Sequence, residues 1–235
     1  LVLLGGLMFV PAVVDPCVPT TTSPTTTPTT SVAPTTTTLV PTTTTTVTPT
    51  TTTLAPTTTT TTLAPLVYQV GDPGPSGGII FYKDLNRPAG SRYFEAACVG
   101  WQNDCDGTTA DPLAEWGCIG TLISGAGSDA IGTGEQNTAD IVTGCPTPGV
   151  AAHLANDLVL GGQTDWFLPS KDELNEMFTM LHSSFIPLGG FLTDYFYLSS
   201  SEDDDASAFA QRFDDGVQDN RSKGTTYYVR PVRVF

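Results

Sequence analysis

The chain has 235 residues, of which 9 are Lys or Arg and 24 are Asp or Glu, and its formal net charge at pH 7 is −15. So acidic a protein has few of the cations that contact phosphate backbones, which argues against nucleic acid as a partner and against direct binding to anionic membranes. The acidity indicates either simple solubility or carboxylates that bind a cation, and calcium is the expected one.

The first 65 residues differ in composition from the rest. Residues 1–19 begin with the apolar run LVLLGGLMFVPAVV, which is too short to cross a bilayer. We interpret it as a secretory signal peptide whose start is missing, with the remnant of a membrane anchor as the alternative. Residues 20–65 are almost entirely Thr and Pro, which disfavour helix and cannot form a core, so a disordered stalk is expected. Residues 66–235 are left for one folded domain.

The first part of the domain has the pattern of strands separated by loops. The apolar runs Leu66–Val70, Ile79–Tyr82 and Tyr93–Ala97 predict strands, and the turn sequence GDPGPSGG separates the first two. Asp104 and Asp106 resemble the start of a calcium loop. The later ligands of such a loop are missing, so a solvated loop is the better interpretation.

Four cysteines lie in the domain. An even number of cysteines after an export signal indicates disulfides, and four cysteines allow three pairings. We favour Cys98 with Cys105 across a short polar loop and Cys118 with Cys145 across a longer one. Zinc is the alternative, but the chain has no CxxC pair and only two histidines.

Two helices are expected after the cysteine-containing loops. Asn137 can cap a short helix that ends near Val142, and Thr147 can cap a second one with Pro148 at its first position. Gly161 and the glycine after it would end that second helix.

The most specific local pattern is a capping box at Ser170 and Glu173, followed by apolar residues at helical spacing. It predicts a helix and makes Glu173 a cap rather than a general base. A strand at Asp165–Leu168 is expected before it, because Pro169 must end the strand. Helices followed by a strand-rich, aromatic tail predict an α+β domain with two main helices and antiparallel strands.

Five short motifs follow one another through the domain. They are VGDPGP with GGIIFY at 70–82, IGTG with QNT at 131–138, Trp166–Leu174, SSSE at 199–202 and VRPVR at 229–233. Together they resemble the Lcl C-terminal domain family, named for a Legionella collagen-like adhesin. The resemblance implies a compact C-type lectin-like domain, similar also to formylglycine-generating enzymes, whose N- and C-terminal strands pair. The sequence departs from the family at Leu198 and Phe209, where Trp is common.

The tail from 201 to 228 alternates structural anchors with polar residues. This texture resembles the variable region of diversity-generating retroelement proteins, which display altered residues on a lectin-like scaffold; a polar surface hairpin of ordinary fixed sequence is the alternative. Tyrosines add the amphipathic contact area that binding surfaces use. The predicted ligand-binding residues are Asp203, Asp205, Ser207, Gln211, Arg212, Asp214, Asp219, Asn220, Arg221 and Tyr227.

No catalytic residues are predicted. His153 and His182 cannot supply a three-histidine iron site, and no cysteine follows Cys145 to form a reactive pair near the tail. Asp214 and Asp215 are adjacent, and adjacent residues on a strand point to opposite faces, which is poor geometry for acid–base work.

The expected function is therefore binding. We expect a non-enzymatic, monomeric adhesin, secreted or held at the cell surface, that binds an extracellular glycan or protein. A structural attachment protein without a specific ligand and a formylglycine-generating-like enzyme are the alternatives. The resemblance also implies glycosaminoglycan binding. A polyanion would need a basic patch on this acidic domain, for which Arg212, Arg221 and Lys223 are the clustered candidates.

Overall fold

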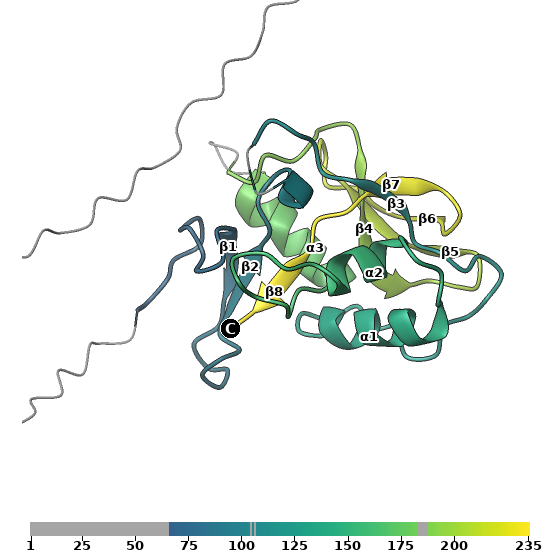
Figure 1. Cartoon of the computed structure of the whole chain (residues 1–235), viewed down its shortest axis with the longest axis horizontal. Coiled ribbons are helices and arrows are strands. Elements are labelled where there is room, and N and C mark those ends of the chain that lie inside the picture. The colour runs from purple at the N-terminus through teal and green to yellow at the C-terminus, as the bar shows by residue number, and fades with distance from the viewer. Residues whose placement is uncertain (1–65, 104, 106, 183–187) are drawn as a thin grey trace, which may run out of the picture. The chain divides into compact units, whose positions relative to one another are not determined.

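The computed structural model describes residues 66–103, 105, 107–182 and 188–235 (Figure 1). The signal-peptide remnant and the stalk expected at 1–65 lie outside the described residues, as do Asp104 and Asp106. In chain order the elements are β1 (Ile79–Lys83), β2 (Tyr93–Ala96), the 3₁₀ turn η1 (Trp101–Asn103), β3 (Leu113–Glu115), α1 (Gly134–Gly144), α2 (Ala151–Asn156), α3 (Lys171–Met177), the π-helical turn η2 (Phe178–His182), β4 (Phe196–Glu202), β5 (Ser207–Arg212), β6 (Gln218–Ser222), β7 (Thr226–Tyr228) and β8 (Val232–Val234).

The strands form two sheets. The smaller has the order β1-β2-β8 and is antiparallel throughout, so the last strand pairs with an early one. The larger has the order β3-β7-β4-β5-β6, and its pairs are antiparallel except β4 with β7. Helices and mixed sheets in one domain confirm the predicted α+β class.

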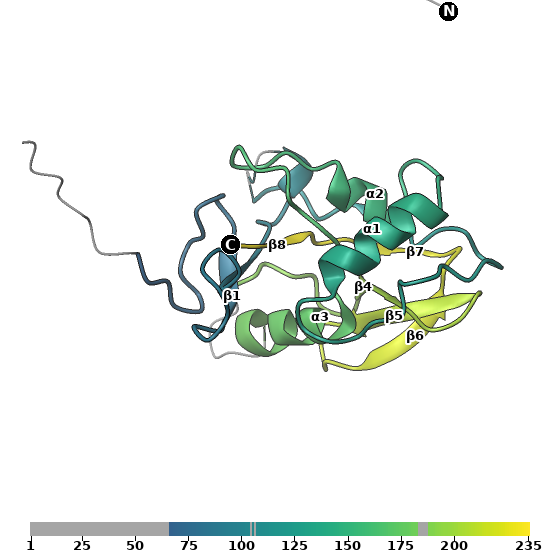
Figure 2. The same ribbon diagram turned by 90° about the horizontal axis from the view of Figure 1, so that it is seen from below.

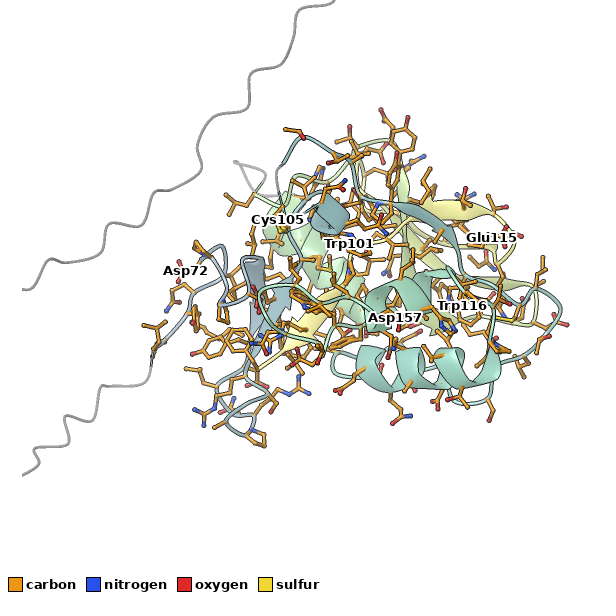
Figure 3. The ribbon with its side chains drawn as sticks, viewed as in Figure 1. Asp72, Trp101, Cys105, Glu115, Trp116 and Asp157 are labelled. Carbon is orange, nitrogen blue, oxygen red and sulfur yellow. A yellow bond between two sulfur atoms is a disulfide. The ribbon has the colours of Figure 1, made fainter. Side chains whose placement is uncertain are left out.

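The helices connect and cover these sheets. The α1 helix packs against α2 and β4, whereas α3 packs against β1 in the smaller sheet and against β4 and β5 in the larger one (Figure 2). Apolar side chains fill the space between them in two clusters. One gathers Trp116, Ile141 and Trp166, and the other gathers Phe81 and Phe213. Trp116 lies inside the domain, and Glu115 lies at its rim (Figure 3).

Two expected strands differ from the structure. Residues 66–70 form no strand: Leu66 is 71% exposed and Val67 is 57% exposed, and the run contacts the domain through the Tyr68 ring instead of pairing with a described strand. Around 165–168 there is only an isolated bridge between Phe167 and Val232. An apolar run predicts burial, but a strand also needs a neighbouring strand at hydrogen-bonding distance, and that depends on the tertiary fold.

The expected helix starts are also displaced. The α1 helix begins at Gly134, so Asn137 lies inside it, fully buried, and its amide donates to Ser128 O at 2.6 Å. The α2 helix begins only after Val150, because Gly149 has φ +81° and interrupts any helix that starts at Thr147.

The predicted capping box is confirmed. Ser170 Oγ accepts from the Glu173 amide at 3.3 Å, and Glu173 Oε2 accepts from the Ser170 amide at 2.7 Å. Glu173 Oε1 accepts a third backbone donor, Gly132 N, at 2.7 Å, which ties the start of α3 to the loop before α1. Burial raises the pKa of Glu173 to about 7.

Both favoured disulfides are confirmed. Cys98 pairs with Cys105 and Cys118 with Cys145, with Cα atoms 5.4 Å and 5.7 Å apart. The second bond joins the loop after β3 to the end of α1, so it holds distant segments together. Disulfides persist in oxidising compartments, and the pair indicates that the domain folds in such a compartment.

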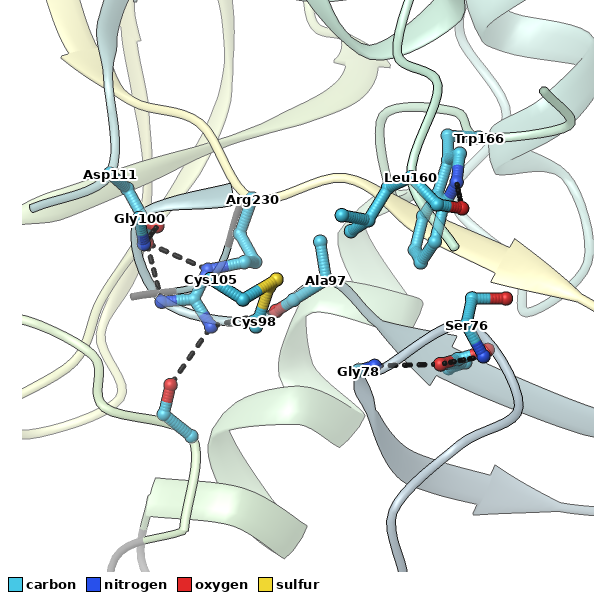
Figure 4. The surroundings of a disulfide bond; sticks show 12 residues. Ser76, Gly78, Ala97, Cys98, Gly100, Cys105, Asp111, Leu160, Trp166 and Arg230 are labelled. Carbon is cyan, nitrogen blue, oxygen red and sulfur yellow. Dashed lines mark hydrogen bonds and ion pairs between the residues drawn. A yellow bond between two sulfur atoms is a disulfide. The ribbon is translucent and has the colours of Figure 1, made fainter. Parts of the chain in front are cut away.

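Buried charges hold the tail to the rest of the domain (Figure 4). Arg230 Nε donates to Asp111 Oδ2 at 2.7 Å, and its NH1 donates to the carbonyls of Ala97 and Gly189. Both ion-paired side chains are at most 1% exposed. Burial raises the pKa of Asp111, and the Arg230 charge opposes that rise.

A second buried carboxylate explains the glycine-rich loop before β1. Glu95 Oε1 accepts from the amides of Ser76 at 3.0 Å and Gly78 at 2.8 Å, and Arg233 lies 3.5 Å from Oε2. A Cβ on Gly78 would lie 2.1 Å from the Ala96 carbonyl oxygen, so only glycine fits there. The motif GDPGPSGG is therefore used for architecture in this fold.

Candidate functional site

The predicted binding residues lie mainly on the β5–β6 hairpin, which has two faces. Residues opposite each other in an antiparallel pair point to the same side, and successive residues point to opposite sides. Ala208 is opposite Arg221, and Ala210 is opposite Asp219, so these four share one face. Phe209, opposite Asn220, points to the other. The structure therefore divides the predicted site between two faces.

One face is built around Phe196, which is opposite Arg212 in the β4–β5 pair. The Arg221 guanidinium lies 3.9 Å from the centre of the Phe196 ring, and that of Arg212 lies 5.8 Å away. The Tyr227 ring, from β7, is 6.3 Å from the Phe196 ring. We call Phe196, Arg212, Asp219, Arg221 and Tyr227 the Phe196 face.

Side chains of the Phe196 face are accessible to a ligand. The side chains of Arg212 and Arg221 are 36% and 34% exposed, and that of Asp219 is 47% exposed. Phe196 and Tyr227 are half-buried. An aromatic centre flanked by arginines is the composition that binding hot spots favour.

The arginines of this face are already paired with carboxylates. Arg221 NH2 lies 2.9 Å from Asp219 Oδ2, and Arg212 Nε lies 2.6 Å from Asp214 Oδ1. Arg212 also binds Asp215, and its hydrogen bond holds the pKa of Asp215 well below its usual range. Each guanidinium is therefore paired with at least one carboxylate, and the face presents directional hydrogen-bonding groups rather than a basic patch.

The expectation that the side chains of Asp214 and Asp215 point to opposite faces of a strand is wrong. Both follow β5 in the turn to β6, where the alternation of side chains along a strand no longer applies. Their carboxylates converge on Arg212. The two acids hold one guanidinium.

The opposite face of the hairpin packs on α3. Lys171 Nζ lies 3.7 Å from the centre of the Phe209 ring. Gln211 is fully buried, and its amide donates to Asn175 Oδ1 at 2.9 Å and to Gly216 O at 3.1 Å. Gln211 was predicted to contact ligand, but its burial places it in the packing between β5 and α3.

The remaining predicted residues lie near the β4–β5 turn. Asp203 Oδ2 accepts from Asn220 Nδ2 at 2.8 Å and from Ser207 Oγ at 3.2 Å. Asp204 Oδ1 accepts from Ser207 as well, which makes it the organiser of the turn. Asp205 is exposed. These residues form a polar rim at the end of the hairpin away from Arg212.

Two outcomes were not foreseen from the tail alone. Phe196 precedes the tail, and the signal that could have found it is the aromatic run Tyr195-Phe196-Tyr197, in which successive rings along a strand occupy opposite faces. Lys223 is fully buried and forms an ion pair with Glu202. It also donates to Thr121 O at 2.9 Å. Lys223 is therefore not part of a surface basic patch.

Within the described part of the chain, no three or more His, Cys, Asp or Glu side chains gather as they would around a metal ion. The same residues contain no helix of the length and apolarity needed to span a membrane. No protein-family model matches the chain, and no curated protein matches it.

Proposed function

We propose that the chain is a non-enzymatic, exported surface protein whose domain binds an extracellular glycan or protein, as an adhesin does. The observation that carries the proposal is the Phe196 face, where four of the ten predicted binding residues meet around one aromatic ring. The resemblance to the Lcl C-terminal domain family and its C-type lectin-like fold supports the same reading. The disulfides agree with secretion or display at the cell surface.

The pairing of both arginines with aspartates narrows the classes of ligand that the Phe196 face can bind. A sulfated glycosaminoglycan would have to displace Asp219 from Arg221, and Asp214 and Asp215 from Arg212, in a protein of net charge −15. A neutral glycan or a protein surface with its own polar groups can bind without breaking these pairs. We therefore expect binding that depends weakly on ionic strength.

The binding test uses a matched pair of variants. Arg221 and Lys171 each place a cation over a phenylalanine ring, but on opposite faces of the hairpin. In a glycan array and an extracellular-protein pull-down with the full chain, Arg221→Gln is expected to lower binding of the captured ligand about tenfold or more. Lys171→Gln is expected to leave it unchanged.

Three results would separate the alternatives in that experiment. Equal loss in both variants would move the site away from the Phe196 face. Capture of no ligand by the parent protein would favour a structural attachment protein. Loss of binding on adding a chelator would assign calcium a role, whereas unchanged binding would leave the acidity as a solubility feature.

We further propose that the hairpin displays retroelement-diversified positions. Asp219, Asn220 and Arg221 follow one another on the edge strand β6, where a change of side chain leaves the buried core untouched. The expected result is a near-identical repeat downstream in the DNA, beside a reverse-transcriptase gene, that differs from the tail only at template adenines. Absence of the repeat would contradict the proposal.

A further inference from the structure

The nine cations of the chain are distributed unevenly. Six form ion pairs with described residues: Lys171, Arg212, Arg221, Lys223, Arg230 and Arg233. The other three, Lys83, Arg87 and Arg92, all lie from the end of β1 to the residue before β2. Lys83 donates to Gln69, and Arg87 lies over the Phe94 ring at 5.1 Å, where its charge favours the ionised form of Glu173 without a direct ion pair to it.

An apolar pocket of about 450 Å³ lies at the connection between β1 and β2. Its wall is apolar apart from Arg92 and the tyrosine hydroxyls, and it contains no Asp or Glu, although the chain has 24 of them. The lining residues are Leu66, Val67, Tyr68, Leu85, Ala89, Gly90, Arg92, Tyr93 and Phe235.

The pocket has a rigid aromatic wall and a hydrophobic rim. The Tyr68 ring is 5.3 Å from the Tyr93 ring and 5.5 Å from the Phe235 ring, and all three rings contact one another. Leu66 and Val67, which form no strand, and Leu85, 50% exposed, place large apolar side chains at the opening. Apolar surface left uncovered in one place marks a binding site more often than chance exposure does.

Arg92 supplies the polar group of the pocket. Its Nε donates to the Arg87 carbonyl at 2.8 Å, which fixes the side chain, and its two terminal nitrogens have no partner among the described residues. A guanidinium binds carboxylate or phosphate through two parallel hydrogen bonds. The volume falls in the range of small-molecule pockets, roughly 300–1,000 Å³, which combine apolar walls with few polar groups.

We propose that this pocket binds a small amphiphile, a fatty-acid carboxylate, with its chain against the aromatic wall and its head group on Arg92. The charge of the wall carries the choice of ligand, because Arg92 is the one cation among the lining residues and no carboxylate lies beside it, in a domain that is acidic elsewhere. The site is separate from the Phe196 face, so the proposal does not depend on the function assigned to that face.

The test is a calorimetric titration of the full chain with decanoate and octanoate below their micellar concentrations and with decanol below its solubility limit. Decanoate is expected to bind, and octanoate about 15-fold more weakly, since each of the two missing methylenes changes affinity about fourfold. Decanol is expected to bind about tenfold more weakly than decanoate, because it has the chain without the charge.

Variants separate the head-group contact from the rest of the site. Arg92→Gln is expected to abolish the preference for decanoate over decanol, Arg92→Lys to keep most of it, and Leu85→Ser to weaken both ligands. Lys171→Gln, which removes a cation outside both the pocket and the Phe196 face, is the control and is expected to change neither. Equal binding of decanoate and decanol by the parent chain, or an unchanged preference in Arg92→Gln, would overturn the proposal.

A membrane lipid offers the same chemistry from another source. Vesicles of phosphatidylcholine with and without phosphatidylglycerol are therefore titrated in parallel. Binding to the anionic vesicles without binding of free decanoate would show a membrane-docking surface instead of a pocket ligand, and it would overturn the assignment made here.

Discussion

Replacing Arg230 with Met is expected to lower the free energy of unfolding by about 3–5 kcal/mol, because it leaves a buried carboxylate without its partner. Asp111 would lose the hydrogen bond from the guanidinium. Its main-chain donor, the Gly100 amide at 3.2 Å, would remain. The carbonyls of Ala97 and Gly189 would also lose their donor. Met is close to Arg in length, so packing against the Phe191 ring is disturbed little.

Urea unfolding monitored by circular dichroism measures this effect. Arg212→Met is the matched control, since it removes an exposed guanidinium that is paired with two partly exposed aspartates, and such pairs contribute about 0–1 kcal/mol. A loss in Arg230→Met no larger than in the control would mean that Asp111 becomes neutral or hydrated at little cost. The buried pair would then not be what holds the tail to the loop that contains Asp111.

Glu173 is expected to make stability fall as pH rises. Burial raises its pKa from 4.5 to about 7 in the folded state, so between these values the folded chain binds more protons than the unfolded chain. The slope of unfolding free energy against pH is then negative. The contribution is full below the ordinary pKa and is lost as pH rises through about 7, a total of up to about 3 kcal/mol.

The measurement compares the parent protein with Glu173→Gln at several pH values between about 4 and 8, where the linkage operates. Gln cannot titrate, and it places an amide group against the Ser170 or Gly132 donor, so it carries a constant cost. The stability advantage of the parent should therefore shrink as pH rises. Glu135→Gln, at an exposed position of α1, is the control, and an advantage independent of pH would contradict the expectation.

The predicted binding residues show how far a single sequence can locate a site. Gln211 and Arg212 are neighbours in a polar tail, and composition treats them alike. The structure turns Gln211 inward, where it bonds to Asn175 of α3, and turns Arg212 outward over Phe196. Strand alternation separates them, but which face is covered depends on where α3 packs, and that is a tertiary property.

Sequence patterns predicted the structure correctly where the interacting residues are close in sequence. The capping box at Ser170 needs only residues three apart, and it forms as predicted. Spacing favoured one of the three possible disulfide pairings, with one short and one longer loop, and the structure has the same pairs. The helix starts expected at Asn137 and Thr147 were misplaced. Asn137 bonds to buried partners in the loop before α1 and in β4, and Gly149 interrupts a helix that starts at Thr147.

The sequence by itself determined an acidic, disulfide-containing α+β domain after a Thr- and Pro-rich segment. Composition and cysteine number are properties of the sequence alone, and a helix cap involves residues only a few positions apart. Only the tertiary structure decided that Lys223 is buried in an ion pair with Glu202. The same holds for the two arginine side chains that lie over the Phe196 ring, and for Arg92, which lines an apolar pocket. Each of these joins residues from separate elements. Whether a charged side chain forms an ion pair depends on which strands become neighbours, and a local sequence pattern does not predict that.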